Sequence, residues 1–357
     1  MHSLKVLIRH AVHVQHNFTE SKGKVTRIIA WRLLIWRIMR LWLHLPLFKG
    51  RNRVFFEFRH YLTDPGHFVL NKTDHGFQMK LNLADEVDAE VYLFGEFDPT
   101  TTIVAKSITR PGDCVIDAGA NVGYFSLLFA SMIGADGLVT AFEPSPTTYK
   151  RLATNLELNP KCRTISVQSA LGEHIGQATL IQQFRERSGD AITVWSDMEL
   201  GKSSIKEVFA EHVVAVDTID DYCQRNDLAP TIIKVDVEGA DLPLLRGSEQ
   251  ILRTSQPILI LELNEAAVQK FGYQLNDMTS WLRETCGYKL FNIGNKQLLP
   301  LTSAAPVSDD EQTTMNVLAV IPEVHSEQFR MACQAISSER HHTGMVEVWP
   351  AGRVAAN

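Results

Sequence analysis

The sequence predicts an α/β fold built around a doubly wound, mostly parallel sheet of seven strands. Two observations lead to this expectation. From about residue 100 onward, short apolar runs alternate with stretches of helical periodicity, and polar residues follow the ends of several of these runs. Nearly continuous apolar strands are typical of parallel sheets that helices cover on both faces.

Seven segments have the length and composition of buried strands. The first five belong to a pattern of alternating strands and helices, which favours parallel pairing through crossover connections. The last two have no helix between them and therefore predict a terminal antiparallel pair. The predicted strands are residues 114–120, 138–144, 164–171, 231–239, 257–264, 289–294 and 313–322, and the predicted helices are 121–134, 146–158, 241–254 and 274–285.

Three further segments flank or interrupt this pattern. Residues 53–94 alternate aromatic and polar positions around turn signals such as Asp74-His75-Gly76, and predict short strands and hairpins. Residues 184–212 are less regular and predict an insertion over the sheet edge, which could act as a lid. We therefore expect an N-terminal extension over residues 1–90, a main domain over 91–322 and a loosely attached tail over 323–357.

The composition excludes several classes of protein. The 357 residues are 45% hydrophobic and 21% charged, as in an ordinary globular protein. A net charge of −6 argues against a general nucleic-acid binder, which would normally be basic. The five cysteines form no C-x-x-C pair, so neither a disulfide framework nor a zinc module is expected. This cysteine usage favours a reducing compartment, and we expect a cytoplasmic protein.

Residues 28–45, IIAWRLLIWRIMRLWLHL, form a run rich in Trp, Leu and Ile. Arg32, Arg37 and Arg40 interrupt the run, which argues against a helix that spans a membrane. Two alternatives remain open. The helix packs on the protein's own core or on a second copy in a homo-oligomer, or it lies in a membrane interface as a peripheral contact.

A glycine-containing loop follows the first predicted parallel strand. It includes Asp117, Gly119, Asn121, Gly123 and Tyr124. In a doubly wound sheet, ligands bind beyond the carboxyl ends of the strands, at this kind of turn. The G-x-N-x-G spacing differs from the G-x-G-x-x-G of nicotinamide enzymes. The alternative reading is a tight turn that binds no ligand.

Glu143 and Pro144 end the second predicted strand. An acidic residue at this position can accept hydrogen bonds from both hydroxyls of a ribose. Alternatively, Glu143 is a charge that the dipole of the following helix favours. Taken together with the glycine loop, it predicts a ligand that contains a nucleoside.

A third polar cluster lies at the fourth predicted strand. Lys234, Asp236 and Glu238 alternate with apolar residues, so they are expected on one face of that strand. The alternative is a buried Lys234–Asp236 ion pair with Glu238 capping the next helix. The following strand ends at Glu262 and Asn264, so polar groups from several strands converge at one edge and predict the floor of an active site.

These motifs together resemble the FkbM family of S-adenosylmethionine-dependent methyltransferases. The resemblance covers roughly residues 90–265 and includes Asp98-Pro99, where an acidic-Pro pair is usual. The segments that carry it are FGEFDPTTTIVAKSITRPGD, DAGANVGYFSLL, AFEPSPTTYKRLATNLELN, SALGE and IIKVDVEGADLPLLRGSEQIL. It implies a Rossmann-like class I methyltransferase fold and O-methylation of hydroxyls on small molecules, natural products or saccharides.

The resemblance also implies roles for individual residues. Those expected around the methionine end of the cofactor are Asp117, Gly119, Asn121 and Gly123, with Tyr124 beside them. Glu143 would hold the ribose, with Pro144 next to it, and the Ala170-Leu171 turn would lie near the adenine. The KVDVEG segment would face the transferred methyl group.

Methylation of a hydroxyl needs a base to take its proton as the new bond forms. Asp236 is the first candidate for that base and Glu238 the second, with Lys234 as an ion-pair partner. No histidine accompanies these carboxylates, so no metal site is predicted. Two other functions stay open: a non-catalytic nucleoside-binding protein that assembles a complex at a membrane through residues 28–45, and a nicotinamide-dependent oxidoreductase, which the glycine spacing disfavours.

Overall fold

The structure is a computed structural model that describes residues 34–36, 38, 68–83, 85–183, 209–294, 297–301 and 314–338. Several predicted features lie wholly or largely outside these residues. They are residues 53–67 of the predicted strand and hairpin segment, most of the 28–45 helix, most of the 184–212 insertion and residues 339–357 of the predicted tail.

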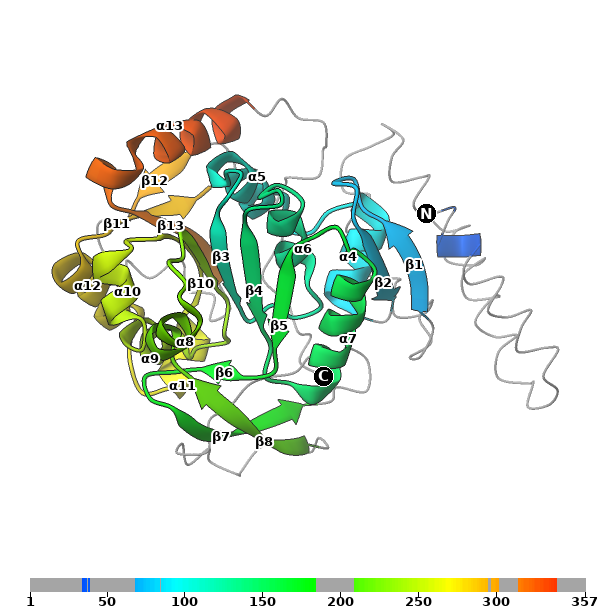
Figure 1. Ribbon diagram of the computed structural model, residues 1–357, viewed down its shortest axis with the longest axis horizontal. Coiled ribbons are helices and arrows are strands. Elements are labelled where there is room, and N and C mark those ends of the chain that lie inside the picture. Colours follow the sequence, from blue (N-terminus) through cyan, green and yellow to red (C-terminus); the bar gives the residue numbers. More distant parts are fainter. Residues whose placement is uncertain are drawn as a thin grey trace, which may run out of the picture.

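The centre of the described part is a mixed sheet of eight strands (Figure 1). Neighbouring strands from β10 to β5 are parallel, and β13 is antiparallel to both β10 and β11. In spatial order the strands are β12 (Leu298–Pro300), β11 (Lys289–Ile293), β13 (Thr314–Val320), β10 (Ile258–Asn264), β9 (Ile232–Val235), β3 (Cys114–Ala118), β4 (Leu138–Phe142) and β5 (Thr164–Val167).

The predicted fold class is confirmed, and so is the antiparallel pairing of the two last predicted strands. The count of seven strands is wrong because β12 adds a short eighth strand beside β11. The segment 164–171 is also not one strand. It contains β5 and a separate two-residue strand, β6 (Ala170–Leu171), which leaves the central sheet.

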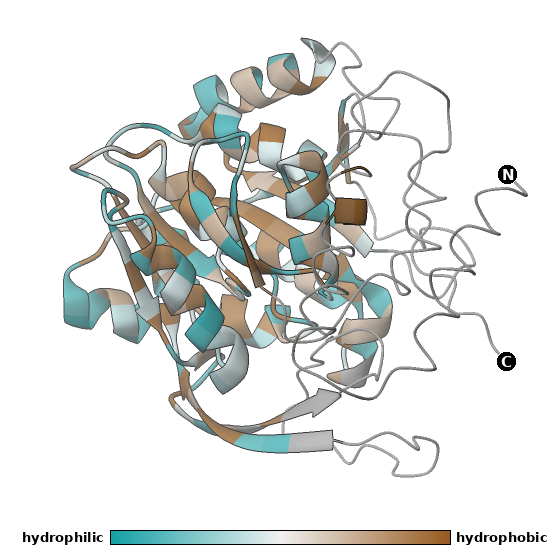
Figure 2. Cartoon of the chain, turned by 90° about the vertical axis from the view of Figure 1, so that its right-hand side faces the viewer, coloured by the Kyte–Doolittle hydropathy of each residue, from teal (hydrophilic) through white to brown (hydrophobic). Residues whose placement is uncertain are grey.

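Helices cover both faces of the central sheet, and a hydrophobic core lies beneath each set. The first core includes residues of α4 (Glu86–Phe94), α5 (Pro99–Ile108), α6 (Tyr124–Ala130), α7 (Pro146–Glu157) and α13 (Pro322–Ser338). The second includes residues of α8 (Ile219–Asn226), α9 (Asp241–Arg246), α10 (Glu249–Thr254), α11 (Glu265–Lys270) and α12 (Leu275–Cys286). Figure 2 shows hydrophobic strands at the centre of this layered arrangement. Burial on both faces explains why the strands read as nearly continuous apolar runs.

A second, three-stranded sheet lies at the end of the molecule below β5 in Figure 1. Its order is β6-β8-β7, with β7 at Gly176–Gln183 and β8 at Phe209–Asp217. β7 and β8 are antiparallel, so they bring the two ends of the predicted insertion together. Residues 209–212 of that insertion are therefore part of a strand.

The N-terminal extension contains the expected hairpin, formed by β1 (Phe68–Lys72) and β2 (Gln78–Asn82) around Asp74-His75-Gly76. The strand prediction is wrong for residues 86–94, which form helix α4. The signals for this helix lie at its ends. The Asp85 side chain accepts a hydrogen bond from the Asp88 amide, and Gly95 ends the helix with a φ of 80°.

Trp36 is the one buried residue among the four described between positions 34 and 38. Its side chain is 1% exposed, and its ring meets Tyr92 of α4 edge to face, with 5.9 Å between centroids. This contact agrees with the alternative in which the N-terminal helix packs on the protein's own core. Among the described residues, no helix combines the length and apolar composition needed to cross a membrane.

The beginning of the predicted tail is an ordered helix. α13 lies against α5, and its Ala332 and Ile336 are buried in the first core. His325, near the start of α13, accepts a hydrogen bond at Nδ1 from the Ile321 amide, 3.0 Å away. The expectation of a loosely attached segment from residue 323 is therefore wrong up to residue 338. Two buried apolar residues four positions apart provide the attachment.

An ion-pair cluster joins the N-terminal extension to α7. Arg151 contacts Asp85 at 3.0 Å and also pairs with Asp88, whose side chain is fully buried. Burial raises the pKa of Asp88 to about 7, with the Asp85 charge adding to the effect and Arg151 opposing it. A carboxyl with a raised pKa binds its proton more tightly in the folded protein, so its contribution to stability falls as the pH rises from about 4 to about 7.

We predict that Arg151→Met lowers the free energy of unfolding by about 3–5 kcal/mol, because it leaves the buried Asp88 carboxylate without a counter-charge. The loss should be larger at about pH 8 than at about pH 5, since protonation neutralises Asp88 at the lower pH. Urea unfolding at the two pH values measures both effects.

Arg253→Met is the matched control, because Arg253 forms an exposed ion pair with Glu249 on a single helix. We expect it to change stability by less than about 0.5 kcal/mol. Equal effects of the two substitutions would contradict a special role for the buried cluster.

Candidate active site

Four polar side chains lie at the carboxyl edge of the central sheet, on the face that carries the first core. They come from four neighbouring strands. In each strand, the residue two positions away on the same face is apolar and belongs to the first core. Asp117 of β3 is paired in register with Lys234 of β9, and Glu262 of β10 with Asn316 of β13. This is the edge at which doubly wound sheets bind ligands.

The glycine loop between β3 and α6 packs against the chain that follows β9. Gly119 has a φ of 79°, and a Cβ built on it would lie 1.8 Å from the carbonyl oxygen of Asp236. The Asp236 amide in turn donates to the Ala118 carbonyl at 3.0 Å. Glycine is required at position 119 by this contact within the chain, whatever ligand the loop holds.

Asn121 and Gly123 shape the rest of the loop, with φ values of 49° and 94°. A Cβ on Gly123 would lie 2.8 Å from Cδ1 of Leu152 in α7, so this glycine allows α6 to begin close to α7. The Asn121 amide donates to Glu143 at 3.1 Å. The loop is thus attached to the end of β4.

Glu143 is a buried carboxylate at the end of β4. One oxygen accepts from the Asn121 amide, and the other accepts from the Ser145 amide at 2.9 Å. Burial raises the pKa of Glu143 to about 7, against the effect of these two hydrogen bonds. The Glu143 carboxylate therefore connects the glycine loop to the start of α7. A ligand that bound Glu143 would share the carboxylate with these two backbone amides. Pro144 beside it is half-buried.

Tyr124 lies inside an aromatic cluster. Its hydroxyl is 3.2 Å from Oγ1 of Thr102, and its ring meets Phe77, Phe97 and Phe125 edge to face. It is 2% exposed, so its described contacts are with the protein's own side chains.

Ala170 and Leu171 form strand β6 where a turn was expected. Both side chains are buried, and Leu171 belongs to the second core. The sheet pairing with Val216 and Asp217 of β8 explains the extended backbone. Their predicted place near an adenine is not tested by these contacts.

Asp117 is fully buried at the end of β3. Its Oδ2 accepts from the Ser126 hydroxyl at 2.5 Å, and its Oδ1 has no hydrogen-bond partner among the described residues. Burial raises its pKa, and the nearby Lys234 ammonium works in the opposite direction. A buried acceptor without a donor costs free energy, which a ligand that donates a hydrogen bond would recover.

Lys234 is the cation of the cluster. Its Nζ donates to Oδ2 of Asp236 at 2.9 Å and lies 4.9 Å from the centroid of the Phe125 ring. Burial lowers the pKa of Lys234, but the carboxylates of Asp236, Asp117 and Glu262 outweigh burial and hold the pKa above its ordinary value. The ion pair considered as an alternative from the sequence is therefore present.

The predicted arrangement of Lys234, Asp236 and Glu238 on one strand face is only partly correct. β9 ends at Val235, so Asp236 and Glu238 lie in the connection to α9. Glu238 has a φ of 54° and is exposed, because the chain turns at this point. Asp236 stays beside Lys234, with 26% of its side chain exposed. The structure thus brings Asp236 and Lys234 together and separates Glu238 from their strand.

Glu262 joins this group from β10. The Asp236 charge, followed by burial, raises the pKa of Glu262 well above its ordinary value. Asn264, two residues further on, has a different role, since its side chain accepts from the Ala267 amide and caps α11. Within the described ranges, no three His, Cys, Asp or Glu side chains are arranged to hold a metal ion.

Asp98 and Asn316 complete the polar edge. Asp98 starts α5, where its Oδ1 accepts from the Thr101 amide at 3.1 Å, and its Oδ2 accepts from Nδ2 of Asn316 at 2.8 Å. The Asp98-Pro99 pair is a helix-start signal that the sequence displays. Asn316 lies within a predicted strand, and no sequence pattern marks it as a site residue. Only the order of strands in the sheet places it beside Glu262.

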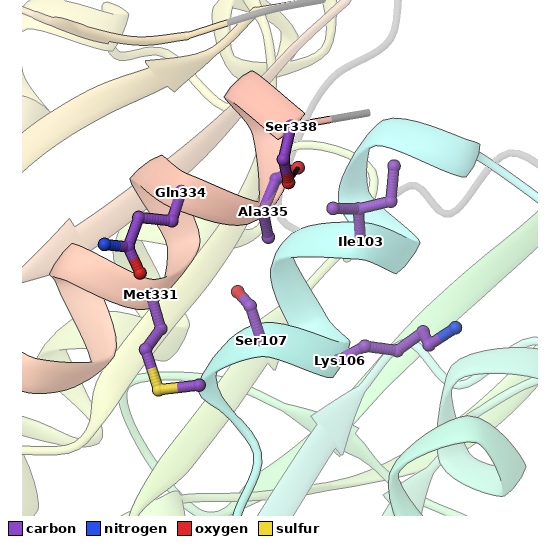
Figure 3. A pocket seen from close by; sticks show the side chains of 7 residues that line it. All are labelled: Ile103, Lys106, Ser107, Met331, Gln334, Ala335 and Ser338. Carbon is purple, nitrogen blue, oxygen red and sulfur yellow. Dashed lines mark hydrogen bonds between the residues drawn. The ribbon is translucent and has the colours of Figure 1, made fainter. Parts of the chain in front are cut away.

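A shallow groove lies away from this edge, between α5 and α13 (Figure 3). Its lining residues are Ile103, Lys106, Ser107, Met331, Gln334, Ala335 and Ser338. α5 begins at the polar edge with Asp98 and runs toward the start of β3, so the groove lies at the far part of that helix. It shares no residue with the polar cluster.

Comparison with known proteins identifies the class. Residues 117–290 match the family model of the methyltransferase FkbM domain. Over this region, which is just under half of its length, the chain carries a methyltransferase domain of the FkbM type, a class of S-adenosylmethionine-dependent methyltransferase.

Three relatives illustrate how far the similarity extends. Methyltransferase sdnD of Sordaria araneosa is 27% identical over 47% of this chain and 76% of its own length. The 31-O-demethyl-FK506 methyltransferase FkbM of Streptomyces tacrolimicus is 26% identical over 39% of this chain and 61% of its own length. The hexuronic acid methyltransferase AglP of Haloferax volcanii is 24% identical over 54% of this chain and 70% of its own length.

Solved structures are similar at a lower level. The methyltransferase FkbM structure from Methylobacillus flagellatus KT has 16% identity and a TM-score of 0.37, covering 64% of this chain and 52% of that one. TYW2 of M. jannaschii, determined in complex with AdoMet, has 14% identity and a TM-score of 0.35, covering 71% and 84%.

We predict that Gly119→Ala destabilises the protein by about 3 kcal/mol or more, because the new methyl group collides with the Asp236 backbone at a positive φ. Thermal or urea unfolding without any ligand measures this effect. Gly176→Ala is the control, since nothing lies within 4 Å of the corresponding Cβ position. If Gly119→Ala were as stable as wild type, the close approach of the two loops would be wrong.

Proposed function

We propose that this protein transfers a methyl group from S-adenosylmethionine to a hydroxyl oxygen of a small molecule, natural product or saccharide. The observation that carries the proposal is the convergence, at one sheet edge, of the glycine loop, Glu143 and the Lys234–Asp236 pair. The match of residues 117–290 to the FkbM domain model supports methyl transfer as the reaction class. The choice of a hydroxyl acceptor rests on the carboxylates beside the loop.

The residues at this edge fit a nucleoside donor. Glu143 offers a buried carboxylate that can accept hydrogen bonds from ribose hydroxyls, and the unpaired Oδ1 of Asp117 can accept one from the methionine end. Gly119, Asn121 and Gly123 would line the same end through their loop. When bound, the donor supplies an electrophilic methyl group. The protein's task is to hold an acceptor oxygen in line with it.

Asp236 is the proposed base for the acceptor hydroxyl. Its side chain is partly exposed and thus accessible to an acceptor, whereas Asp117 is fully buried. Lys234 holds one Asp236 oxygen at 2.9 Å, which orients the carboxylate and leaves the other oxygen to receive a proton. Glu238 remains the second candidate because it is exposed at the same edge.

Two relatives guide the proposed range of acceptors. The name of one specifies 31-O-demethyl-FK506 and that of another hexuronic acid, so the proposed range covers a natural product and a saccharide. An assay with methyl-labelled donor and a fractionated cell extract would identify the acceptor. Calorimetry with S-adenosylhomocysteine and, separately, a nicotinamide dinucleotide tests the donor. Binding of the dinucleotide alone would overturn the proposal.

We predict that Glu143→Gln weakens S-adenosylhomocysteine binding by roughly tenfold or more above about pH 8, because a charged acceptor of two ribose hydroxyls is lost. The wild-type affinity should rise as the pH passes the Glu143 pKa of about 7, since the carboxylate accepts hydrogen bonds more strongly than the acid. The variant should lack this dependence.

Calorimetry across this pH range measures both effects. Glu173→Gln is the control, because Glu173 forms a half-exposed ion pair with Arg246. A Glu143→Gln variant that binds like wild type at every pH would exclude Glu143 from the cofactor site.

We also predict that Asp236→Asn keeps S-adenosylhomocysteine affinity and lowers turnover by roughly 10²–10⁴-fold, since it preserves shape and removes the proton acceptor. Label transfer into the acceptor fraction measures turnover. Glu238→Gln serves as the comparison and should lose much less. A larger loss for Glu238→Gln would transfer the role of base to that residue.

A further inference from the structure

Asn155 of α7 connects two parts of the chain that are distant in sequence. Its Oδ1 accepts from the Lys80 amide of β2 at 2.7 Å, and its Nδ2 donates to the Val122 carbonyl at 2.8 Å. The side chain is fully buried. One amide group therefore joins the N-terminal hairpin to the glycine loop.

The hairpin contacts the same loop a second time through aromatic rings. The ring of Phe77, the residue before β2, lies 5.7 Å from the ring of Tyr124, and the ring of His75, in the hairpin turn, lies 6.4 Å from it. Tyr124 directly follows the loop and begins α6. The hairpin thus supports both Val122 and Tyr124, although it lies outside the residues that match the family model.

The loop needs such support because its backbone is in uncommon conformations. Asn121 has a φ of 49° and Gly123 a φ of 94°, in the left-handed region that residues with a side chain adopt infrequently. The Asn121 amide must also point at Glu143 for the loop and the proposed ribose acceptor to meet. Val122 comes next, so a bond to its carbonyl restrains this peptide directly.

We propose that Asn155 is a positioning residue for the cofactor site, which it preorganises by fastening the Val122 carbonyl to the N-terminal hairpin. This inference rests on the proposed function, because it assigns the loop to the cofactor. Asn155 acts through Val122 and Asn121. In this proposal the N-terminal hairpin helps to hold the glycine loop in the conformation that binds the cofactor.

Asn159, just beyond the end of α7, provides a matched control. Its side chain also bonds to β2, accepting from the Gln78 amide at 2.9 Å and donating to the Gln78 carbonyl at 2.7 Å. Its Nδ2 also donates to the Asn155 carbonyl at 2.8 Å. Asn159 therefore shares the hairpin contact of Asn155 and lacks the bond to the loop.

The experiment compares Asn155→Ala with Asn159→Ala in the full chain. We expect the first substitution to raise the dissociation constant of S-adenosylhomocysteine by about tenfold or more, and the second by less than about threefold. Hydrogen exchange of the 119–123 amides should accelerate in Asn155→Ala relative to those of β3 and β4. That local readout separates positioning from a general loss of stability. Asn155→Ser takes the place of Asn155→Ala if the latter does not fold.

Each outcome has one meaning. A selective loss of affinity with selective loop exchange supports the inference. Equal effects of the Asn155 and Asn159 substitutions, with wild type binding normally, overturn it and leave the proposed function standing. Failure of wild type itself to bind S-adenosylhomocysteine overturns the proposed function, and the inference with it.

Discussion

The candidate site depends on one buried cation. Lys234 lies at the end of the central strand β9, where the Asp117, Asp236 and Glu262 carboxylates all lie near its ammonium group. Without that charge, the buried Asp117 and the largely buried Glu262 and Asp236 carboxylates would repel one another at the sheet edge. Its neighbours also determine its own state, since they keep Lys234 protonated despite burial. The charge of Lys234 and the charges of these carboxylates therefore stabilise one another.

The sequence was sufficient for those parts of the site that local patterns encode. The glycine loop, Glu143 and the Lys234–Asp236 pair each follow an apolar run, and the rule that ligands bind at strand ends placed them together. The contacts that these residues make within the protein could not be predicted from local patterns. Gly119 is required because the Asp236 carbonyl approaches it, and that contact involves two loops more than a hundred residues apart in the chain.

The errors have identifiable physical causes. Residues 86–94 became a helix because Asp85 and Gly95 cap it, although the surrounding alternation favours strands. Glu238 left the predicted strand face because a turn in the left-handed region follows Val235. Asn316 could not be found at all, since its position beside Glu262 arises from the insertion of β13 between two earlier strands. Long-range sheet order is the information that local patterns lack.

That insertion has a consequence for the order in which a ribosome produces the molecule. β10 and β11 emerge before β13, yet β13 lies between them, so the apolar β10 edge stays unpaired until nearly all the described chain has been made. Exposed strand edges invite association with other chains. Asn316 arrives on that same late strand and only then reaches Asp98. The nascent protein therefore pairs the β10 edge and brings Asn316 to Asp98 in the same late step, when β13 enters the sheet.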